Sequence, residues 1–272
     1  MSESRTPTRF MPNYTYARSN AAEELNRELT TSSQVDQTFD PLPASTSIGH
    51  ALLLGAPPGE WNTLPIDSLS YRLGKRAFDL VLAIAITPVV GLAMVIIAAA
   101  ISFSSGMPIF FRQWRIGQGG REFQIWKFRT MHRDAEEIFA SHLFRDDAAR
   151  HEWHTTQKLR NDPRTTRLGD WLRKTSLDEL PQLLNIFAGH MSFVGPRPII
   201  RAEVPKYRNS FTYYKAAVPG LTGLWQVSGR CNVGYKARVI LDSSYVCNWS
   251  FWRDLKILLK TPKAVYRRDG AY

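Results

Sequence analysis

A long uncharged segment dominates the pattern of hydrophobic and polar positions along the chain. Residues Leu80–Phe111 contain no charged side chain, and their apolar centre, Leu80–Ile101, consists mainly of Ala, Val, Ile and Leu. That centre is 22 residues long, and a helix needs about 20 residues to cross the hydrocarbon core of a bilayer. A helix buried in a soluble protein rarely extends so far without a polar face. The segment therefore predicts a membrane helix.

Basic residues flank this segment at both ends. Those before it are Arg72, Lys75 and Arg76, and those after it are Arg112, Arg115 and Arg121. Because basic flanks mark the cytoplasmic side, a single span would place one cluster on the wrong side. Thr87-Pro88 lies in the middle, where Pro88 removes a backbone donor and Thr87 can bond a freed carbonyl. We expect a re-entrant helix–break–helix hairpin over residues 80–101, with a proline-kinked span as the alternative.

The remaining pattern predicts short elements. Pro108–Trp114 and Phe123–Phe128 have the character of two strands joined by a glycine-rich turn. Asp134–Lys158 and Leu180–Phe187 have the character of helices, whereas Val218–Arg230 is typical of a loop. The tail, Phe251–Arg268, is a basic amphipathic helix that lies on an anionic membrane or packs against the domain. The expected fold class is α+β, mostly α, with a re-entrant membrane hairpin, a small β-hairpin or sheet, and interfacial amphipathic helices.

Charge divides the chain into two parts. Residues 1–70 carry 4 Lys/Arg against 8 Asp/Glu, and they are rich in Ser, Thr, Pro, Asn and Glu without a sustained period. Residues 71–272 carry 31 Lys/Arg against 16 Asp/Glu, a net charge of +15. We therefore expect a disordered acidic leader over residues 1–70 and a folded, membrane-embedded domain over residues 71–272. Such a basic domain suits nucleic acid, phospholipid head groups or a phosphorylated small molecule.

Candidate chemistry concentrates between Trp171 and Pro198. Asp178 and Glu179 stand where the helix over Leu180–Phe187 begins, so the helix dipole favours their ionised forms. Asp178 is either a functional carboxylate or only a helix N-cap. Arg197 lies between two prolines, and an Arg held in such a stiff loop can clamp a phosphate, although a solvated turn residue is the alternative. The two cysteines of the chain, Cys231 and Cys247, exclude a disulfide framework, and no zinc spacing is present.

Several long motifs occur in a fixed order. They are KRAFDLVLA, the hydrophobic segment with its central proline, RIGQGGREFQIWKFRTM, NDPRTTRLGDWLRKTSLDELPQLLNIFAGHMSFVGPRP, PGLTGLWQVSGR and LDSSYVCNWSFWRDLKILLKT. Over residues 71–272 the chain resembles the bacterial sugar transferase family, the monotopic polyprenyl-phosphate phosphoglycosyl transferases. Within that family it looks most like the exopolysaccharide-initiating galactosyl-phosphate transferases. The resemblance implies an enzyme on the cytoplasmic face of the bacterial inner membrane.

The resemblance also implies a reaction. Sugar-1-phosphate, with galactose as the expected sugar, passes from a UDP-sugar to undecaprenyl phosphate, and UMP is released. Asp178 is implied to be the nucleophile that forms a covalent aspartyl-phosphosugar intermediate. Glu179, with Asp178, is implied to hold Mg²⁺, and Arg197 to bind phosphate. Glucose and N-acetylhexosamine donors remain alternatives, and the oligomeric state, with a homodimer as one option, is left open.

Further assignments depend on charge and motif position. Lys127, Arg129 and Arg173 are candidates for binding phosphate oxygens, each with a surface or head-group contact as the alternative. Asp242 is a candidate for contacting the nucleotide or Mg²⁺, with a structural salt bridge as the alternative. Three rival functions stand beside the transferase. They are a basic nucleic-acid-binding protein, which the uncharged segment disfavours, a non-catalytic membrane adaptor of a polysaccharide assembly complex, and a transferase without a covalent intermediate.

Overall fold

A computed structural model of the chain describes residues 64–156, 159, 161–229 and 234–266. Most of the leader predicted over residues 1–70 therefore lies outside the described residues. The part that is described belongs to the folded body, because Ile66 is only 2% exposed and packs in the main hydrophobic cluster.

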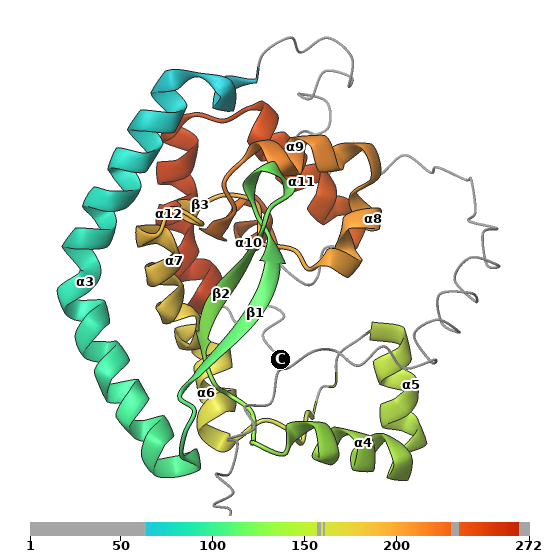
Figure 1. Ribbon diagram of the computed structural model, residues 1–272. Coiled ribbons are helices and arrows are strands. Elements are labelled where there is room, and N and C mark those ends of the chain that lie inside the picture. Colours follow the sequence, from blue (N-terminus) through green and yellow to red (C-terminus); the bar gives the residue numbers. More distant parts are fainter. Residues whose placement is uncertain (1–63, 157–158, 160, 230–233, 267–272) are drawn as a thin grey trace, which may run out of the picture. The chain divides into compact units, whose positions relative to one another are not determined.

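The described chain is mostly helical, with two small sheets (Figure 1). Its first helix is α3, Leu69–Ser105, followed by strands β1, Phe110–Ile116, and β2, Glu122–Phe128. The middle of the chain forms α4, Ala135–Arg145, α5, Asp147–Thr156, α6, Arg167–Thr175, the 3-10 helix η3, Leu177–Gln182, α7, Leu183–Phe187, and β3, Ser192–Val194. The last part forms α8, Val204–Tyr207, α9, Phe211–Ala216, β4, Gly220–Thr222, α10, Leu224–Val227, α11, Tyr235–Cys247, and α12, Phe251–Tyr266. Short 3-10 turns are Pro65–Asp67, Gln118–Gly120, Arg201–Glu203 and Arg208–Ser210. This architecture confirms a mostly helical α+β fold.

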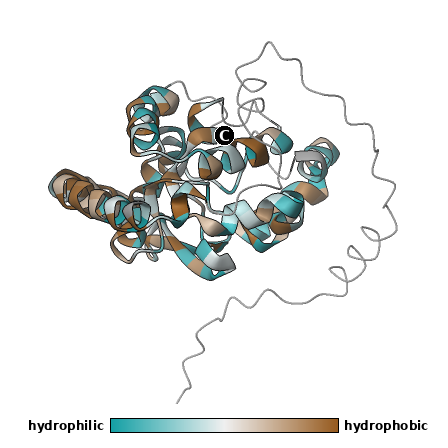
Figure 2. Ribbon diagram, turned by 90° about the horizontal axis from the view of Figure 1, so that it is seen from above, coloured by the Kyte–Doolittle hydropathy of each residue, from teal (hydrophilic) through white to brown (hydrophobic). Residues whose placement is uncertain are grey.

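Helix α3 contains the whole predicted membrane segment. The hydroxyl of Ser68 caps its start by accepting a hydrogen bond from the Tyr71 amide at 3.1 Å. Among the described helices, α3 alone is long and apolar enough to cross a membrane by length and composition. Hydrophobic residues make up most of this helix (Figure 2). Its exposed apolar residues include Val81, Ile84, Val89, Leu92, Val95, Ile96 and Phe103. Such an open apolar surface is unusual for a soluble domain.

The interruption predicted at Thr87-Pro88 is absent. Helix α3 continues across both residues, and Figure 1 shows it as a curved rod rather than two antiparallel arms. Pro88 cannot donate to the carbonyl of Ile84, four residues earlier. The Thr87 hydroxyl donates instead to the neighbouring Ala83 carbonyl at 2.7 Å, so the expected bond to the freed carbonyl is not the one observed. A proline inside a helix can kink it without ending it.

Both ends of α3 are bound to the same folded body. Near its start, the Lys75 ammonium contacts Asp254 of α12 at 2.7 Å, and Asp79 accepts from the Phe193 amide of β3 at 3.2 Å. Near its end, Ile101 is buried in a cluster with Phe128 and Leu172. The face of α3 opposite its exposed apolar side is therefore packed against the domain along most of its length.

Strands β1 and β2 form the predicted antiparallel hairpin. Their register pairs Phe111 with Lys127 and Arg115 with Phe123. Because side chains alternate between the two faces of a strand, Lys127 and Arg115 lie on the same face of the hairpin. The connecting turn uses Gly119 and Gly120 at φ of 69° and 76°, which explains the glycine cluster.

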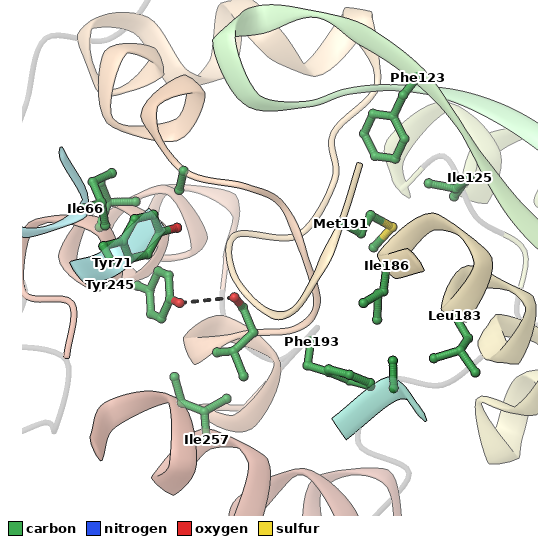
Figure 3. Close-up of a cluster of buried hydrophobic side chains, with 14 residues drawn as sticks. Ile66, Tyr71, Phe123, Ile125, Leu183, Ile186, Met191, Phe193, Tyr245 and Ile257 are labelled. Atoms are coloured by element: carbon green, nitrogen blue, oxygen red, sulfur yellow. Dashed lines mark hydrogen bonds between the residues drawn. The ribbon is translucent and has the colours of Figure 1, made fainter. Parts of the chain in front are cut away.

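Strands β3 and β4 form a second, parallel pair. Val194 is aligned with Thr222, and the Tyr245 hydroxyl donates to the Val194 carbonyl at 3.1 Å inside the core (Figure 3). Strand β4 and helix α10 correct the prediction that residues 218–230 form only a loop. The glycines permit this pairing, since a Cβ on Gly220 would lie 2.0 Å from the Gly195 nitrogen.

The other predicted helices are also present. Residues 134–158 contain two helices, α4 and α5, apart from residues 157 and 158, which lie outside the described part. The tail forms α12, which packs through Asp254 and Ile257 while Trp252 and Leu259 stay exposed. Packing against the domain is therefore observed for α12, whereas its contact with a membrane stays a prediction.

Candidate active site

Asp178 and Glu179 lie in the first turn of η3, directly after α6. Helix α6 ends where Ser176 adopts a left-handed conformation, with φ of 58°, and η3 begins at the next residue. Ser176 occupies the N-cap position of η3 but makes no side-chain cap, and η3 begins at Leu177, one residue before Asp178. The sharp reversal places both carboxylates beside strand β2.

Two cations hold this pair of carboxylates. The Lys127 ammonium lies 2.8 Å from Glu179 Oε1 and 3.4 Å from Asp178 Oδ2, and the Arg197 guanidinium lies 3.2 Å from Glu179 Oε1. Glu179 thus receives two cations at close range, whereas Asp178 receives one weaker contact. No residue in the described part of the chain donates a hydrogen bond to Asp178 Oδ1.

The two carboxylates consequently differ in electrostatics. Burial raises the pKa of Asp178 above its ordinary value, and the attraction of Lys127 only partly opposes that rise. Burial alone would also raise the pKa of Glu179, but Lys127 and Arg197 outweigh it and hold this pKa well below its usual range. Pairs of groups with opposite shifts are typical of sites that assign them different tasks. Glu179 is a firmly held anion, whereas Asp178 is the carboxylate with the weaker ionic contact and the raised pKa.

Arg197 extends from the loop that follows β3. Gly195 begins this loop where a Cβ would meet the Val218 carbonyl at 2.4 Å, so only glycine allows the close approach. Pro196 and Pro198 restrict the backbone on either side of Arg197. The sequence-based interpretation of a stiff loop that fixes a guanidinium agrees with this geometry.

Arg173 and Arg129, two other predicted site residues, contact different parts of the protein. Arg173 donates to the hydroxyls of Thr130 and Thr165 at 2.9 and 3.2 Å, and its charge acts on Asp178. Arg129 donates to the Ser105 and Gly106 carbonyls at 2.8 and 2.7 Å, at the end of α3. Arg173 thus lies near Asp178, whereas Arg129 is hydrogen-bonded to the end of α3. The role of each in phosphate binding stays a prediction.

Asp242 is buried in a separate polar network on α11. It accepts a hydrogen bond from the Tyr207 hydroxyl at 2.7 Å, and the Arg238 Nε lies 3.8 Å away. Burial raises the pKa of Asp242 to about 6, although Arg238 and Tyr207 oppose that shift. These contacts are those of a structural ion pair, and contact with a nucleotide or Mg²⁺ stays a prediction.

Two arginines near the site were not singled out from the sequence as site residues. Arg115 lies on the Lys127 face of the hairpin and donates to the Pro198 carbonyl at 3.3 Å. Arg238 donates to the Arg197 carbonyl at 3.3 Å. The alternation of side chains along the two strands predicts that Arg115 and Lys127 lie on the same face of the hairpin. Nothing local in the sequence connects Arg238 with Arg197.

The donor set at Asp178 and Glu179 suits a hard divalent cation. No group of three or more His, Cys, Asp or Glu side chains gathers among the residues that the structure describes. Mg²⁺ does not require such a cage, since one or two carboxylates combined with substrate phosphates and water usually hold it. The ammonium of Lys127 already bridges the two carboxylates, which indicates a location that favours positive charge. Two adjacent carboxylates are compatible with Mg²⁺ when a phosphorylated ligand supplies the remaining oxygens.

The structure thus combines an apolar helix, long enough to cross a membrane by length and composition, with a largely enclosed cluster of Asp178, Glu179, Lys127 and Arg197. Residues 70–268 match the bacterial sugar transferase family, and the chain belongs to that family. This finding confirms the resemblance seen in the sequence motifs.

Curated relatives carry related names. The chain is 51% identical over 203 residues to a UDP-galactose-lipid carrier transferase of Erwinia amylovora, covering 75% of this chain and 42% of that protein. It is 48% identical to an undecaprenyl-phosphate galactose phosphotransferase of Salmonella typhimurium, with the same coverage of 75% and 42%. It is 44% identical to the exopolysaccharide production protein ExoY of Sinorhizobium fredii, covering 76% of this chain and 90% of that protein. The chain thus spans less than half the length of the first two relatives and most of the third.

Proposed function

We propose that this protein transfers sugar-1-phosphate, with galactose as the sugar, from a UDP-sugar to undecaprenyl phosphate and releases UMP. The step would begin exopolysaccharide synthesis. The observation that carries the proposal is the unequal environment of the two adjacent carboxylates. Glu179 is bound by two cations, whereas no described residue donates a hydrogen bond to Asp178 Oδ1. Family membership and the names of the relatives support the choice of substrates.

In the first half of the reaction, an oxygen of Asp178 attacks the phosphorus that bears the sugar. A bond forms between that oxygen and phosphorus, the bond from phosphorus to the UMP oxygen breaks, and UMP leaves with the electron pair. The product is an aspartyl-phosphosugar, a form of covalent catalysis that carboxylates support. Lys127 and Arg197 lie where they can bind phosphoryl oxygens and offset their charge.

In the second half, an oxygen of undecaprenyl phosphate attacks the same phosphorus. The bond between phosphorus and Asp178 breaks, and the carboxylate is restored. Asp178 and Glu179 would hold Mg²⁺, which supplies charge neutralisation of the donor pyrophosphate when bound. Because one carboxylate accepts and then releases the phosphosugar, the kinetics are expected to be ping-pong.

We propose further that α3 enters one leaflet and returns, with both ends on the cytoplasmic side of the inner membrane. Both ends of α3 contact one folded body, through Lys75 and Asp79 at the start and Ile101 at the end. A body of this kind cannot lie on both sides of a bilayer. The exposed apolar side of α3 would then lie in lipid, and the basic residues of α12 would lie near anionic head groups.

Cysteine labelling tests this topology. Leu69 and Met107 flank the apolar segment and are 69% and 59% exposed. In cells that carry Leu69→Cys or Met107→Cys in a background without Cys231 and Cys247, a membrane-impermeant maleimide should label neither position from outside. It should label both in inverted vesicles. Labelling of one position from outside would mean that α3 spans the membrane.

The reaction is tested most directly without the lipid acceptor. Detergent-solubilised protein is incubated with Mg²⁺ and either UDP-galactose or UDP-glucose, and the intact mass is measured. We expect a hexose-phosphate adduct with wild type and UDP-galactose, none with Asp178→Asn, and none after divalent ions are removed with EDTA. Asp170→Asn is a matched control, since Asp170 is a surface carboxylate paired with Lys174, and it should form the adduct normally.

Other outcomes would change the proposal in defined ways. An adduct with UDP-glucose alone would replace the sugar and keep the mechanism. Normal transfer to undecaprenyl phosphate without any adduct would indicate direct displacement, with Asp178 reduced to a metal ligand. Neither adduct nor transfer with hexose or N-acetylhexosamine donors would contradict the enzyme and favour a non-catalytic adaptor.

A further inference from the structure

The loop that carries Arg197 is held through its backbone rather than through its side chains. Between Gly195 and Ile199, most of the amides and carbonyls have a protein partner. The bonds are Gly195 N to Thr222 O at 2.9 Å, Gly220 N to Pro196 O at 2.9 Å, Arg238 Nη2 to Arg197 O at 3.3 Å, Arg115 Nη1 to Pro198 O at 3.3 Å, Ile199 N to the Tyr214 Oη at 3.2 Å, and Ile116 N to Ile199 O at 2.8 Å. Elements from four parts of the chain therefore fix this loop.

At Arg197 itself, the backbone contact comes from Arg238 of α11. The Arg238 guanidinium donates at the same time to Glu203 Oε1 at 3.2 Å, and its Nε lies 3.8 Å from Asp242 Oδ2. Its central carbon is 5.0 Å from the ring centroid of Trp225 and 5.3 Å from that of Tyr235. Contacts in several directions leave this planar group a single orientation. Arg238 is thus a rigid bridge between α11 and the Arg197 backbone.

Asp242 forms an ion pair with Arg238 on the same helix, α11. It is only 1% exposed, and its Oδ2 receives the Tyr207 hydroxyl at 2.7 Å. An acidic residue so enclosed can orient Arg238 without touching a ligand. The network connects Tyr207, Asp242 and Arg238 with the carbonyl of Arg197, while the Arg197 side chain points to Glu179.

We propose that Arg238 is a positioning residue for sugar-phosphate transfer, which holds the Arg197 carbonyl so that the Arg197 guanidinium faces the reacting phosphoryl group. The inference rests on the proposed function. Electrostatic stabilisation of a transferring phosphoryl group depends on charges that are already in place. A displacement of about 1 Å can lower a rate about 100-fold. Asp242 acts in the same chain by orienting Arg238.

A double-mutant cycle separates this role from general support of the fold. The rate of adduct formation is measured in single turnovers for Arg238→Lys, Arg197→Ala and the double variant. Lysine keeps the positive charge beside Glu203 and Asp242, but one ammonium cannot reproduce the fork that reaches the Arg197 carbonyl. We expect Arg238→Lys to lower the rate of adduct formation by about 100-fold when Arg197 is intact. In the Arg197→Ala background we expect less than about a threefold further loss, because residues that act through one another are not additive.

Arg253→Lys is the matched control. Arg253 also donates to two backbone carbonyls, those of Ser244 and Asn248 at 3.2 and 2.8 Å, but these lie at the end of α11. This variant should leave the rate unchanged in the wild-type background and in the Arg197→Ala background. If Arg238→Lys fails to fold, Asp242→Asn takes its place, with a smaller loss that also disappears in the Arg197→Ala background.

The outcomes distinguish the two proposals. Equal losses in both backgrounds, or no loss with Arg238→Lys, would overturn the positioning role and leave the proposed function intact. If wild type transfers sugar-phosphate without an adduct, the same cycle is read on the transfer rate. Absence of both adduct and transfer in wild type would overturn the proposed function, and this inference with it.

Discussion

The outer side of α3 and the cluster around Asp178 depart in opposite directions from the usual placement of side chains. On α3, apolar side chains that a soluble domain would bury are open, with Val89 75% and Phe103 92% exposed. Around Asp178, side chains that water would normally solvate are enclosed, with those of Asp178, Glu179 and Lys127 at 11%, 16% and 18% exposure. Each arrangement costs free energy in a monomeric protein in water.

Because of this difference, the two regions are chemically suited to different partners. The exposed apolar surface of α3 suits a medium that forms no hydrogen bonds. The charged cluster suits an anion that can bind its two cations, Lys127 and Arg197. The regions are also connected, since Asp79 of α3 binds the strand that leads to Arg197. The proposed transfer of sugar-1-phosphate from a nucleotide carrier to a lipid carrier would use both regions, held in one folded body.

The largest effect is expected from removing the positive charge of Lys127, the partly buried cation that the two carboxylates share. Lys127→Met removes the closest positive charge from Asp178 and Glu179. Loss of one preorganised electrostatic contact lowers rates by about 100- to 1,000-fold, so adduct formation at neutral pH should fall by at least about 100-fold. Burial already raises the pKa of Asp178 while Lys127 lowers it. Without Lys127 this pKa rises further, and the residual rate should increase with pH up to a more alkaline limit than in wild type.

A pH–rate profile checks the sign of that shift. Lys174→Met is the matched control, since Lys174 pairs with Asp170 at the surface at 45% and 51% side-chain exposure, and it should leave the profile unchanged. A profile for Lys127→Met that keeps the wild-type limit would show that Lys127 does not control the ionisation of Asp178.

A somewhat smaller effect is expected from placing a charge on the exposed side of α3. Leu92 is 64% exposed, so Leu92→Lys should not disturb packing within the domain. A lysine near the centre of a membrane helix costs about 3 kcal/mol, which corresponds to roughly a 100-fold weaker partition into vesicles. Phe144→Lys on α4 is the control, because Phe144 is 85% exposed and belongs to no membrane segment. Equal partition of the two variants in vesicle flotation would contradict a lipid-facing α3.

Elements with short-range signals could be predicted from the sequence. The β1–β2 hairpin follows from two apolar runs around a glycine turn, and α3 from its length without charge. Strand β4 could not be predicted, because three residues carry no period and their partner β3 ends at Val194, far away in the sequence. The continuity of α3 through Pro88 could not be predicted either, because a proline can kink a helix or break it and the local sequence does not decide between the two.

The site shows the same limit. Asp178 and Glu179 are adjacent in the sequence, and the stiff loop around Arg197 is local, so both could be singled out. Basic character alone did not identify the partners of Arg129, which binds the end of α3. The role inferred for Arg238 depends on the approach of α11 to a loop 41 residues away along the chain. Tertiary contacts of this kind become visible only when the chain is folded.

The smallest effect is expected where the two regions meet. Asp79 is 3% exposed, and its Oδ1 accepts from the Ser192 hydroxyl at 3.0 Å and the Phe193 amide at 3.2 Å. Asp79→Ala removes both bonds, each worth about 1 kcal/mol, and loosens the strand before Arg197. Adduct formation should fall roughly tenfold, less than the roughly 30-fold that a full loss of about 2 kcal/mol would give, while membrane partition stays unchanged.

Asp79→Asn is the conservative variant that tests how the connection works. It keeps the accepting oxygen, so it should recover most of the wild-type rate in the same adduct assay if hydrogen bonding to β3 is what matters. A rate as low as that of Asp79→Ala would mean that the negative charge, rather than the bond to the strand, is required. A loss of membrane partition comparable with that of Leu92→Lys would instead assign Asp79 to the lipid-contacting region, and the two regions would no longer be separable at this residue.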